Sequence, residues 1–150
     1  SEAFDEKNGA WYNEYQKLKS LLSPEEYASA RESTLNAHYT SPIIIRSIYD
    51  TLGRMGFEKG NILEPSIGIG NFFGMLPERM QDSRLYGVEL DSLTGRIAKQ
   101  LYPKAEIQIS GFEKTNHPKD FFDVVVGNVP FGQYKVADKP YDKHNFLIHD

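Results

Sequence analysis

The chain contains no cysteine among its 150 residues. This absence excludes disulfide frameworks and thiol-based zinc sites. Apolar runs long enough to span a bilayer are also missing, as is a secretory signal sequence, so we expect a cytoplasmic protein without membrane contact. The four histidines show no metal-ligand spacing, and we expect no metal site.

Positive charge is scarce as well. The chain has 17 Lys and Arg against 21 Asp and Glu, which gives a net charge of −4. A protein that binds nucleic acid unaided normally presents a basic face, so any DNA contacts are expected mostly outside this chain. Hydrophobic residues make up 39% and aromatic residues 13%, enough for one domain with a core.

Two closely spaced glycines mark the first motif. The apolar run at residues 61–63 is too short for a helix, stops at Glu64 and is followed by Gly68 and Gly70. Glycine lets the backbone turn sharply and lets a ligand approach where a Cβ would collide. The pattern predicts a strand, a tight turn and a short helix within residues 71–80.

Three further strands are predicted, over residues 84–88, 105–109 and 121–127. The second strand ends at Glu89, and an acid at this point of a βαβ unit usually binds ribose hydroxyls. The alternation of strands and helices predicts an α/β, Rossmann-like fold.

The glycines alone also fit a nicotinamide dinucleotide, because Gly68, Gly70 and Gly74 form a G-x-G-x-x-x-G series. Two features favour another ligand. Glu64 would repel a pyrophosphate but can accept hydrogen bonds from a cationic amino-acid group. Residues 128–131, N-V-P-F, place an amide, a bend and an aromatic ring after the fourth strand, where a dehydrogenase needs none.

Four elements in order resemble the S-adenosylmethionine-dependent N6-adenine DNA methyltransferases of the amino-methylase group. They are H-Y-T-S-P at 38–42, similar to the family's Y-T-P element; E-P-S-I-G-I-G-N-F at 64–72, similar to its glycine motif; Glu89, similar to its ribose-binding acid; and N-V-P-F at 128–131, similar to its N-P-P-Y/F catalytic motif. More narrowly, the chain resembles the methylase domains of helicase-methylase fusion proteins carried by mobile elements.

The resemblance implies a class I methyltransferase core that uses S-adenosyl-L-methionine to methylate the N6 amine of adenine in DNA. The cofactor-binding residues that it implies are Tyr39, Thr40, Glu64, Ser66, Gly68, Gly70, Glu89, Leu90 and Phe112. The catalytic residues that it implies are Asn128, Val129, Pro130 and Phe131. The Asn128 side-chain oxygen and the Val129 carbonyl would accept from the amine of a flipped adenine, on which Phe131 would stack.

The chain departs from the family pattern at three places. Ser41 replaces the proline of Y-T-P, although Ser41 as N-cap and Pro42 as first helical residue still predict a helix start. Gly111 stands where the family has an acid, and the nearest acid is Glu113. Val129 replaces the first catalytic proline, which stiffens the loop in the family. Two alternatives therefore remain: a degenerate fold acting as a donor-binding or interaction module, and an amine methylase for protein or RNA.

The expected organisation is an N-terminal helical arm over residues 1–34 and the N-terminal part of the methyltransferase domain over residues 35–150. S-P-E-E at 23–26 predicts a capped helix that ends near Glu32, and we expect the arm to pack on the domain rather than bind a partner. A helix predicted over 142–148 and the missing later strands place the rest of the core beyond Asp150. The resemblance adds a fused helicase as an expected partner, and the open edge of the fourth strand predicts self-association.

Overall fold

The structure, a computed structural model, describes residues 2–36 and 39–129, with side chains throughout except at 33–36. Its helices are α1 (Tyr12–Leu21), α2 (Pro24–Asn36), α3 (Pro42–Arg54), α4 (Asn71–Gly74) and α5 (Ser92–Leu101). Its strands are β1 (Asn61–Glu64), β2 (Arg84–Glu89), β3 (Glu106–Ile109) and β4 (Val124–Val125). Short 3-10 turns cover Glu2–Phe4, Gly9–Trp11, Glu78–Met80 and Phe112–Lys114.

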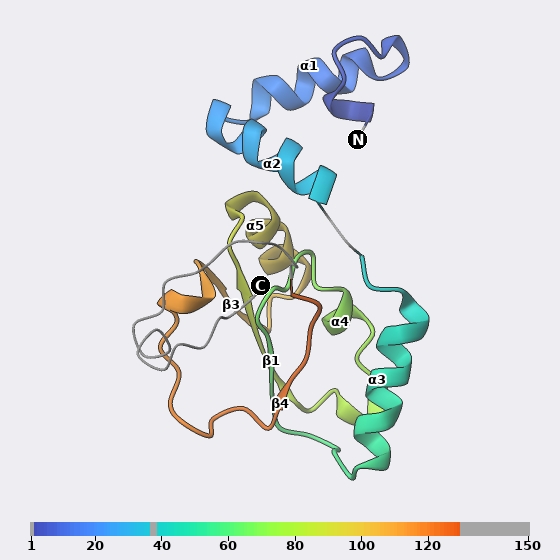
Figure 1. Cartoon of the computed structure of the whole chain (residues 1–150), viewed down its shortest axis with the longest axis vertical. Helices are drawn as coiled ribbons and strands as arrows, with labels where there is room; N and C mark the ends of the chain where they lie inside the picture. Colours follow the sequence, from blue (N-terminus) through green and yellow to red (C-terminus); the bar gives the residue numbers. More distant parts are fainter. Residues whose placement is uncertain (1, 37–38, 130–150) are drawn as a thin grey trace, which may run out of the picture.

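The strands form one parallel sheet in the order β3-β2-β1-β4. The central strand β1 lies between β2 and β4 (Figure 1). Strands β2 and β3 follow on one side of β1 and β4 returns to its other side, so β1 is the point at which the strand order reverses. In such sheets ligands bind outside the carboxyl ends of the strands at the point of reversal. The predicted α/β fold is therefore confirmed, with its binding edge at the end of β1.

Helices α3, α4 and α5 cover one face of the sheet. The cluster beneath α3 comprises Ile45, Tyr49, Ile62, Phe72, Met80, Val124 and Val126. The cluster beneath α5 comprises Ile67, Phe73, Ala98 and Ile107. Leu85 on β2 packs against both clusters, so the three helices share one continuous core.

Aromatic rings cover part of the opposite face. The ring of Tyr86 on β2 lies 5.3 Å from the rings of both Phe121 and Phe122, and the His117 ring lies 4.8 Å from that of Phe122. Such tilted aromatic pairs add stabilisation beyond the area that they bury. Val125 on β4 lies on the same face and is 61% exposed, so among the described residues the β4 side of this face is uncovered.

The fourth strand is shorter than the predicted residues 121–127, because β4 comprises only Val124–Val125. The backbone N–H groups of Asp123 and Val126 still donate to carbonyls of β1, at 2.9 Å each. The prediction was wrong at the start of the strand, since the two phenylalanines before Asp123 turn their rings onto β2 instead of extending the ladder.

The helix predicted within residues 71–80 is also shorter than expected. Helix α4 ends at Gly74, and a separate turn covers Glu78–Met80. Pro77 separates them because it has an extended backbone, with ψ 151°, and no N–H to donate. The first helix of the domain, α3, begins at Pro42 as predicted, although the Ser41 side chain makes no capping hydrogen bond. The helix predicted over 142–148 lies outside the described residues.

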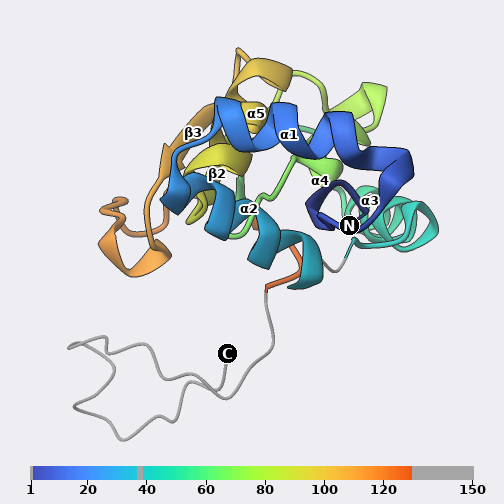
Figure 2. The same ribbon diagram turned by 90° about the horizontal axis from the view of Figure 1, so that it is seen from above.

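The N-terminal arm packs on the domain. Figures 1 and 2 show α2 beside α5, and the Glu26 and Arg96 side chains form an ion pair of 2.6 Å between them. Ser23 and Glu26 form the predicted capping box, with reciprocal hydrogen bonds of 3.0 and 3.2 Å. Helix α2 runs on to Asn36, beyond the predicted end near Glu32. No described helix is long and apolar enough to cross a membrane.

A hydrogen bond in the core ties α3 to α4. The fully buried Tyr49 hydroxyl donates to the Phe72 carbonyl at 2.9 Å. Tyr49→Phe should lower the free energy of unfolding by about 1 kcal/mol, because it removes a buried hydrogen bond and leaves the carbonyl only the Met75 N–H, at 3.2 Å. Chemical denaturation measures the change. Tyr12→Phe on the exposed side of α1 is the control and should stay within about 0.5 kcal/mol of wild type, so equal losses in both variants would contradict the assignment.

Candidate functional site

Three strand ends meet at one edge of the sheet. Glu64 ends β1, Glu89 ends β2, and Gly127 follows β4. A Cβ added at Gly127 would lie 3.4 Å from Pro65 and 3.5 Å from Glu64 Cγ, so the chain leaving β4 runs directly against the end of β1. The two residues after Gly127 are Asn128 and Val129, both exposed. The fold thus brings the start of the predicted catalytic loop beside the predicted cofactor motif.

The turn after β1 is anchored on β2. The Gly68 N–H donates to Glu89 Oε2 at 2.8 Å, and the Ile67 N–H donates to the Val88 carbonyl at 2.9 Å. Gly68 and Gly70 both have positive φ, 55° and 84°, a conformation that favours glycine. The Glu89 carboxylate therefore holds the glycine turn as well as ending its own strand.

Gly68 and Gly70 have different surroundings in the turn. A Cβ added at Gly70 would collide with the ring of Tyr102, and one added at Gly74 would lie 2.7 Å from the Tyr102 hydroxyl oxygen. A Cβ at Gly68 would meet nothing within 4 Å. Packing against Tyr102 therefore explains two glycines of the G-x-G-x-x-x-G series, and Gly68 alone borders open space where a ligand can approach.

Tyr102 is a site residue that sequence reasoning missed. It lies at the C-terminal end of α5, and its ring stands edge-on to Phe73 with centroids 5.7 Å apart. The signal that points to it is the spacing of Gly70 and Gly74, which places two residues without side chains on one face of a helical turn.

Glu64 is buried at the end of β1. The residue is 3% exposed, and its Oε2 atom has no hydrogen-bond partner among the described residues. Burial, and after it the charge of Glu89, raises the pKa of Glu64 from 4.5 to about 9. A buried acid in this state is stabilised by a cationic donor that restores its charged form, so the residue fits the amino group of an amino-acid ligand.

Glu89 is half-buried at the same edge. Its Oε1 atom accepts from the Asp91 N–H at 2.9 Å, while Oε2 accepts from Gly68. Each carboxylate oxygen has two acceptor positions, so both oxygens retain capacity for hydroxyl donors. The arrangement fits a ribose.

The apolar residues of the predicted site are exposed. Leu90 is 76%, Tyr39 68% and Phe112 50% exposed, which leaves their surfaces free for a flat ligand. Phe112 lies just after β3, as the acid Glu89 lies at the end of the neighbouring β2. Glu89 and Phe112 therefore lie at the ends of neighbouring strands.

Glu113 lies where a side chain at position 111 would begin. A Cβ added at Gly111 would collide with both carboxylate oxygens of Glu113. In the family pattern an acid stands one residue before the aromatic residue, at the position that Gly111 occupies here. The acid of this chain, Glu113, comes two residues later in the sequence, but its carboxylate folds back over Gly111. Sequence reasoning noted the displacement and missed this return.

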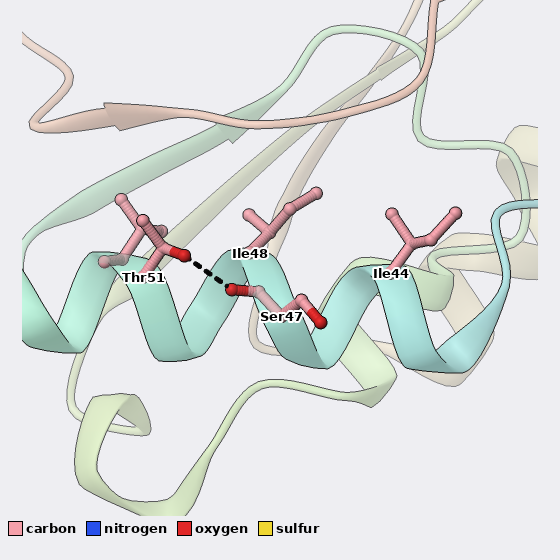
Figure 3. A pocket seen from close by; sticks show the side chains of 5 residues that line it. Ile44, Ser47, Ile48 and Thr51 are labelled. Atoms are coloured by element: carbon pink, nitrogen blue, oxygen red, sulfur yellow. Dashed lines mark hydrogen bonds between the residues drawn. The ribbon is translucent and has the colours of Figure 1, made fainter.

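Other parts of the predicted site do not enter this geometry. Pro130 and Phe131 lie outside the described residues. Within residues 2–36 and 39–129, no cluster of three or more acids and histidines could hold a metal ion. A hollow along α3 is mostly apolar and has no charged residue in its lining (Figure 3). It is lined by Ile44, Ser47, Ile48, Thr51 and Leu52, none of which was predicted to bind the cofactor.

Comparison with known proteins agrees with this geometry. No family model matches the chain. The chain is 37% identical over 113 residues to Defense against restriction protein B of Escherichia phage P1, covering 72% of this chain and 5% of that protein. It is 34% identical over 104 residues to the Type II methyltransferase M.CvrRI of Paramecium bursaria Chlorella virus XZ-6E, covering 69% of this chain and 26% of that protein.

A solved structure from Listeria monocytogenes, described as a class I S-adenosylmethionine-dependent methyltransferase, superposes with a TM-score of 0.54 at 17% identity, covering 97% of this chain and 50% of that one. The chain has the fold of the class I S-adenosylmethionine-dependent methyltransferases and is related in sequence to the two proteins above. S-adenosylmethionine is accordingly the cofactor that its strand ends are built to receive. The described residues fit it, since Glu64 offers an unpaired buried acceptor and Gly68 borders open space.

The buried acid should make the stability of this methyltransferase domain depend on pH. Because the pKa of Glu64 is higher in the folded state, its contribution is fully present below pH 4.5 and is lost as pH rises toward about 9. The free energy of unfolding should fall by about 1 kcal/mol per pH unit across this window. Glu64→Gln should remove that slope in denaturation measured at several pH values. The exposed Glu58→Gln is the control, and a slope that persists in Glu64→Gln would contradict the assignment.

The two glycines of the turn should respond differently to alanine. Gly70→Ala should lower the free energy of unfolding by several kcal/mol, because the new Cβ meets Tyr102 as well as an unfavourable φ. Gly68→Ala should cost only about 1 kcal/mol from φ and should weaken S-adenosylmethionine binding instead. Thermal melts and calorimetry separate the two effects. If Gly68→Ala and Gly70→Ala were equally destabilised, and Gly68→Ala bound S-adenosylmethionine as wild type does, the conclusion that Gly68 borders open space for the ligand would be contradicted.

Proposed function

We propose that the chain is the donor-binding part of an enzyme that methylates the N6 amine of adenine in DNA. The proposal is supported by the position of Gly127, which precedes the catalytic loop: a Cβ added there would lie 3.5 Å from Glu64 Cγ at the end of β1. In the proposal, Asn128 and Val129 therefore act next to the cofactor motif. We also propose the domain division given by the resemblance, with an arm over residues 1–34 and the methyltransferase domain from residue 35 onward.

The donor is held by its polar ends in this proposal. Glu64 accepts from the amino group of the methionine part, assisted by Tyr39 and Thr40 from the loop before α3 and by Ser66 from the turn. Gly68 and Gly70 shape the turn so that the backbone can approach the ligand. The burial of Glu64 supports its assignment to the amino group, because among these residues its buried Oε2 atom lacks a hydrogen-bond donor that a cationic group would supply.

The other end of the donor lies against the tips of β2 and β3. Glu89 accepts from the ribose hydroxyls, and Leu90 and Phe112 enclose the adenine between exposed apolar surfaces. We assign the Glu113 carboxylate the hydrogen bonding to that ring, since it folds back over Gly111. The chain thus keeps an acid beside the aromatic residue despite the glycine at position 111.

The catalytic loop activates the amine of the target base. S-adenosylmethionine supplies a methyl group bound to a positively charged sulfur. Asn128 and the Val129 carbonyl would accept hydrogen bonds from the two amine protons, which returns lone-pair density to the nitrogen. The nitrogen would then bond to the methyl carbon as the bond from that carbon to sulfur breaks; the thioether S-adenosylhomocysteine leaves, and the methylated amine loses one proton to solvent. Val129 can serve because the acceptor is a backbone carbonyl. Pro130 and Phe131 complete the loop in this proposal, with Phe131 stacking on the flipped base.

DNA as the substrate is supported by the names of the two relatives, one a Type II methyltransferase and the other a protein of defense against restriction. The chain spans only 5% and 26% of their lengths, so a fused helicase and most DNA contacts belong to regions beyond this chain in the proposal. The net charge of −4 agrees with this division, because phosphate contacts require a basic surface. The degenerate module and the protein or RNA methylase are outcomes of the test below.

Asn128→Ala tests the catalytic assignment. Radiolabelled methyl transfer to adenine-containing duplexes should fall by about 100-fold or more in the full-length protein, while affinity for the donor changes little, because the contact is strongest in the transition state. Asn13→Ala on the exposed side of α1 is the matched control and should keep wild-type activity.

The same assay separates the alternatives. Val129→Pro should keep or raise the rate. Activity that appears only in Val129→Pro would show that the natural domain is a degenerate binder. Incorporation into protein or RNA and none into DNA would assign the enzyme to a different amine.

A further inference from the structure

The arm meets the domain at a charged residue beside the predicted ribose acid. The Ser29 hydroxyl on α2 donates to Asp91 Oδ1 at 2.6 Å. The ion pair between Glu26 and Arg96 lies on the same two helices. Helices α2 and α5 are in contact, and Figure 1 shows α2 above α5. The junction is therefore built from polar contacts directed at the first turn of α5.

Asp91 bonds to the arm, to helix α5 and to the tip of β2. Its side chain accepts from Ser29 through Oδ1 and, as N-cap of α5, from the Thr94 N–H through Oδ2 at 2.8 Å. Burial alone would raise the pKa of Asp91, but the hydrogen bonds from Ser29 and Thr94 outweigh it and lower the pKa. Its backbone N–H donates to Glu89 Oε1 at 2.9 Å. A carboxylate that stays charged thus holds the arm, the helix and the strand tip together.

These bonds form an unbroken series from the arm to the glycine turn. Ser29 binds Asp91, the Asp91 N–H binds Glu89, and Glu89 accepts from the Gly68 N–H at 2.8 Å. The Glu89 carboxylate is fixed from two sides by backbone donors, and one of these donors belongs to the residue that the arm restrains. In the sequence, α2 ends at Asn36, a few residues before Tyr39 and Thr40.

We propose that the helical arm is part of the donor site, with Ser29 and Asp91 as positioning residues that orient Glu89 toward the ribose. The proposal rests on the function proposed above, in which Glu89 accepts from the ribose hydroxyls. It assigns the arm a role beyond packing. Without Ser29, Asp91 loses its link to α2, so its N–H is held less firmly and the hydrogen bond that orients Glu89 Oε1 is weakened.

Calorimetry on the intact protein tests the proposal with two probes. One probe is S-adenosylhomocysteine, and the other is its analogue without the two ribose hydroxyls. Ser29→Ala should lower affinity for the first probe about 3- to 10-fold, the effect of a weakened hydrogen bond to a charged group. It should leave affinity for the second probe within about 2-fold of wild type, since that ligand has no hydroxyl for Glu89 to hold.

Two further variants complete the design. Ser20→Ala removes a hydroxyl that donates to the Lys17 carbonyl within α1, and it should change neither affinity. In a Glu89→Ala background, Ser29→Ala should cause no further loss, because the residue through which it acts is gone. Melting temperatures confirm that each variant is folded.

The outcomes separate the two proposals. Unchanged affinity for S-adenosylhomocysteine in Ser29→Ala, or an equal loss for both probes, would overturn the positioning role while Glu89→Ala still shows a loss. Unchanged affinity in Glu89→Ala itself would overturn the ribose assignment, and with it the inference about the arm.

Discussion

The hydrogen bond from the Gly68 N–H to the Glu89 carboxylate is the contact on which the rest of the site depends. It closes the turn after β1 onto the tip of β2, and it requires the two strands to lie in the observed register, with Glu64 beside Gly87. The approach is close, because a Cβ at Gly87 would lie 2.6 Å from Ile67 of the turn. A shift in that register would move the glycine turn away from its acid.

Two carboxylates near this contact have opposite environments. Glu89 is surrounded by backbone donors, whereas Glu64 is buried with one oxygen unpaired. Packing alone would favour a neutral residue at position 64, since burial of an unpaired acid destabilises the folded state. Its presence at the binding edge of the sheet agrees with a ligand that supplies the missing cation. At this residue, the side chain that favours ligand binding lowers the stability of the folded state.

The sequence predicted the parts of the fold that local chemistry controls. The strand at residues 61–63, the glycine turn and the capping box at Ser23 and Glu26 were all found, since each depends on residues close in sequence. It missed Tyr102, the return of Glu113 over Gly111 and the link from Ser29 to Asp91, which pairs residues 62 positions apart. Such contacts depend on how helices pack on the sheet. No local pattern encodes that packing.

In the proposed enzyme, the strand ends of this chain contribute to binding the methyl donor. The described residues include all the cofactor-binding positions of the proposed enzyme, and of its proposed catalytic loop they include Asn128 and Val129. This division agrees with a domain whose cofactor binding is local to this chain. Target recognition is left to regions beyond it in the proposed enzyme.

The most direct test of the account is the proton balance of cofactor binding. Titration calorimetry at pH 6.5 in two buffers with different ionisation enthalpies counts the protons exchanged when S-adenosylmethionine binds. The account predicts release of about one proton, because Glu64 is neutral in the empty site and must ionise to pair with the amino group of the ligand. Glu64→Gln should release none and bind much more weakly. Binding without proton release, at equal affinity in wild type and Glu64→Gln, would contradict the assignment of Glu64 and the donor site built around it.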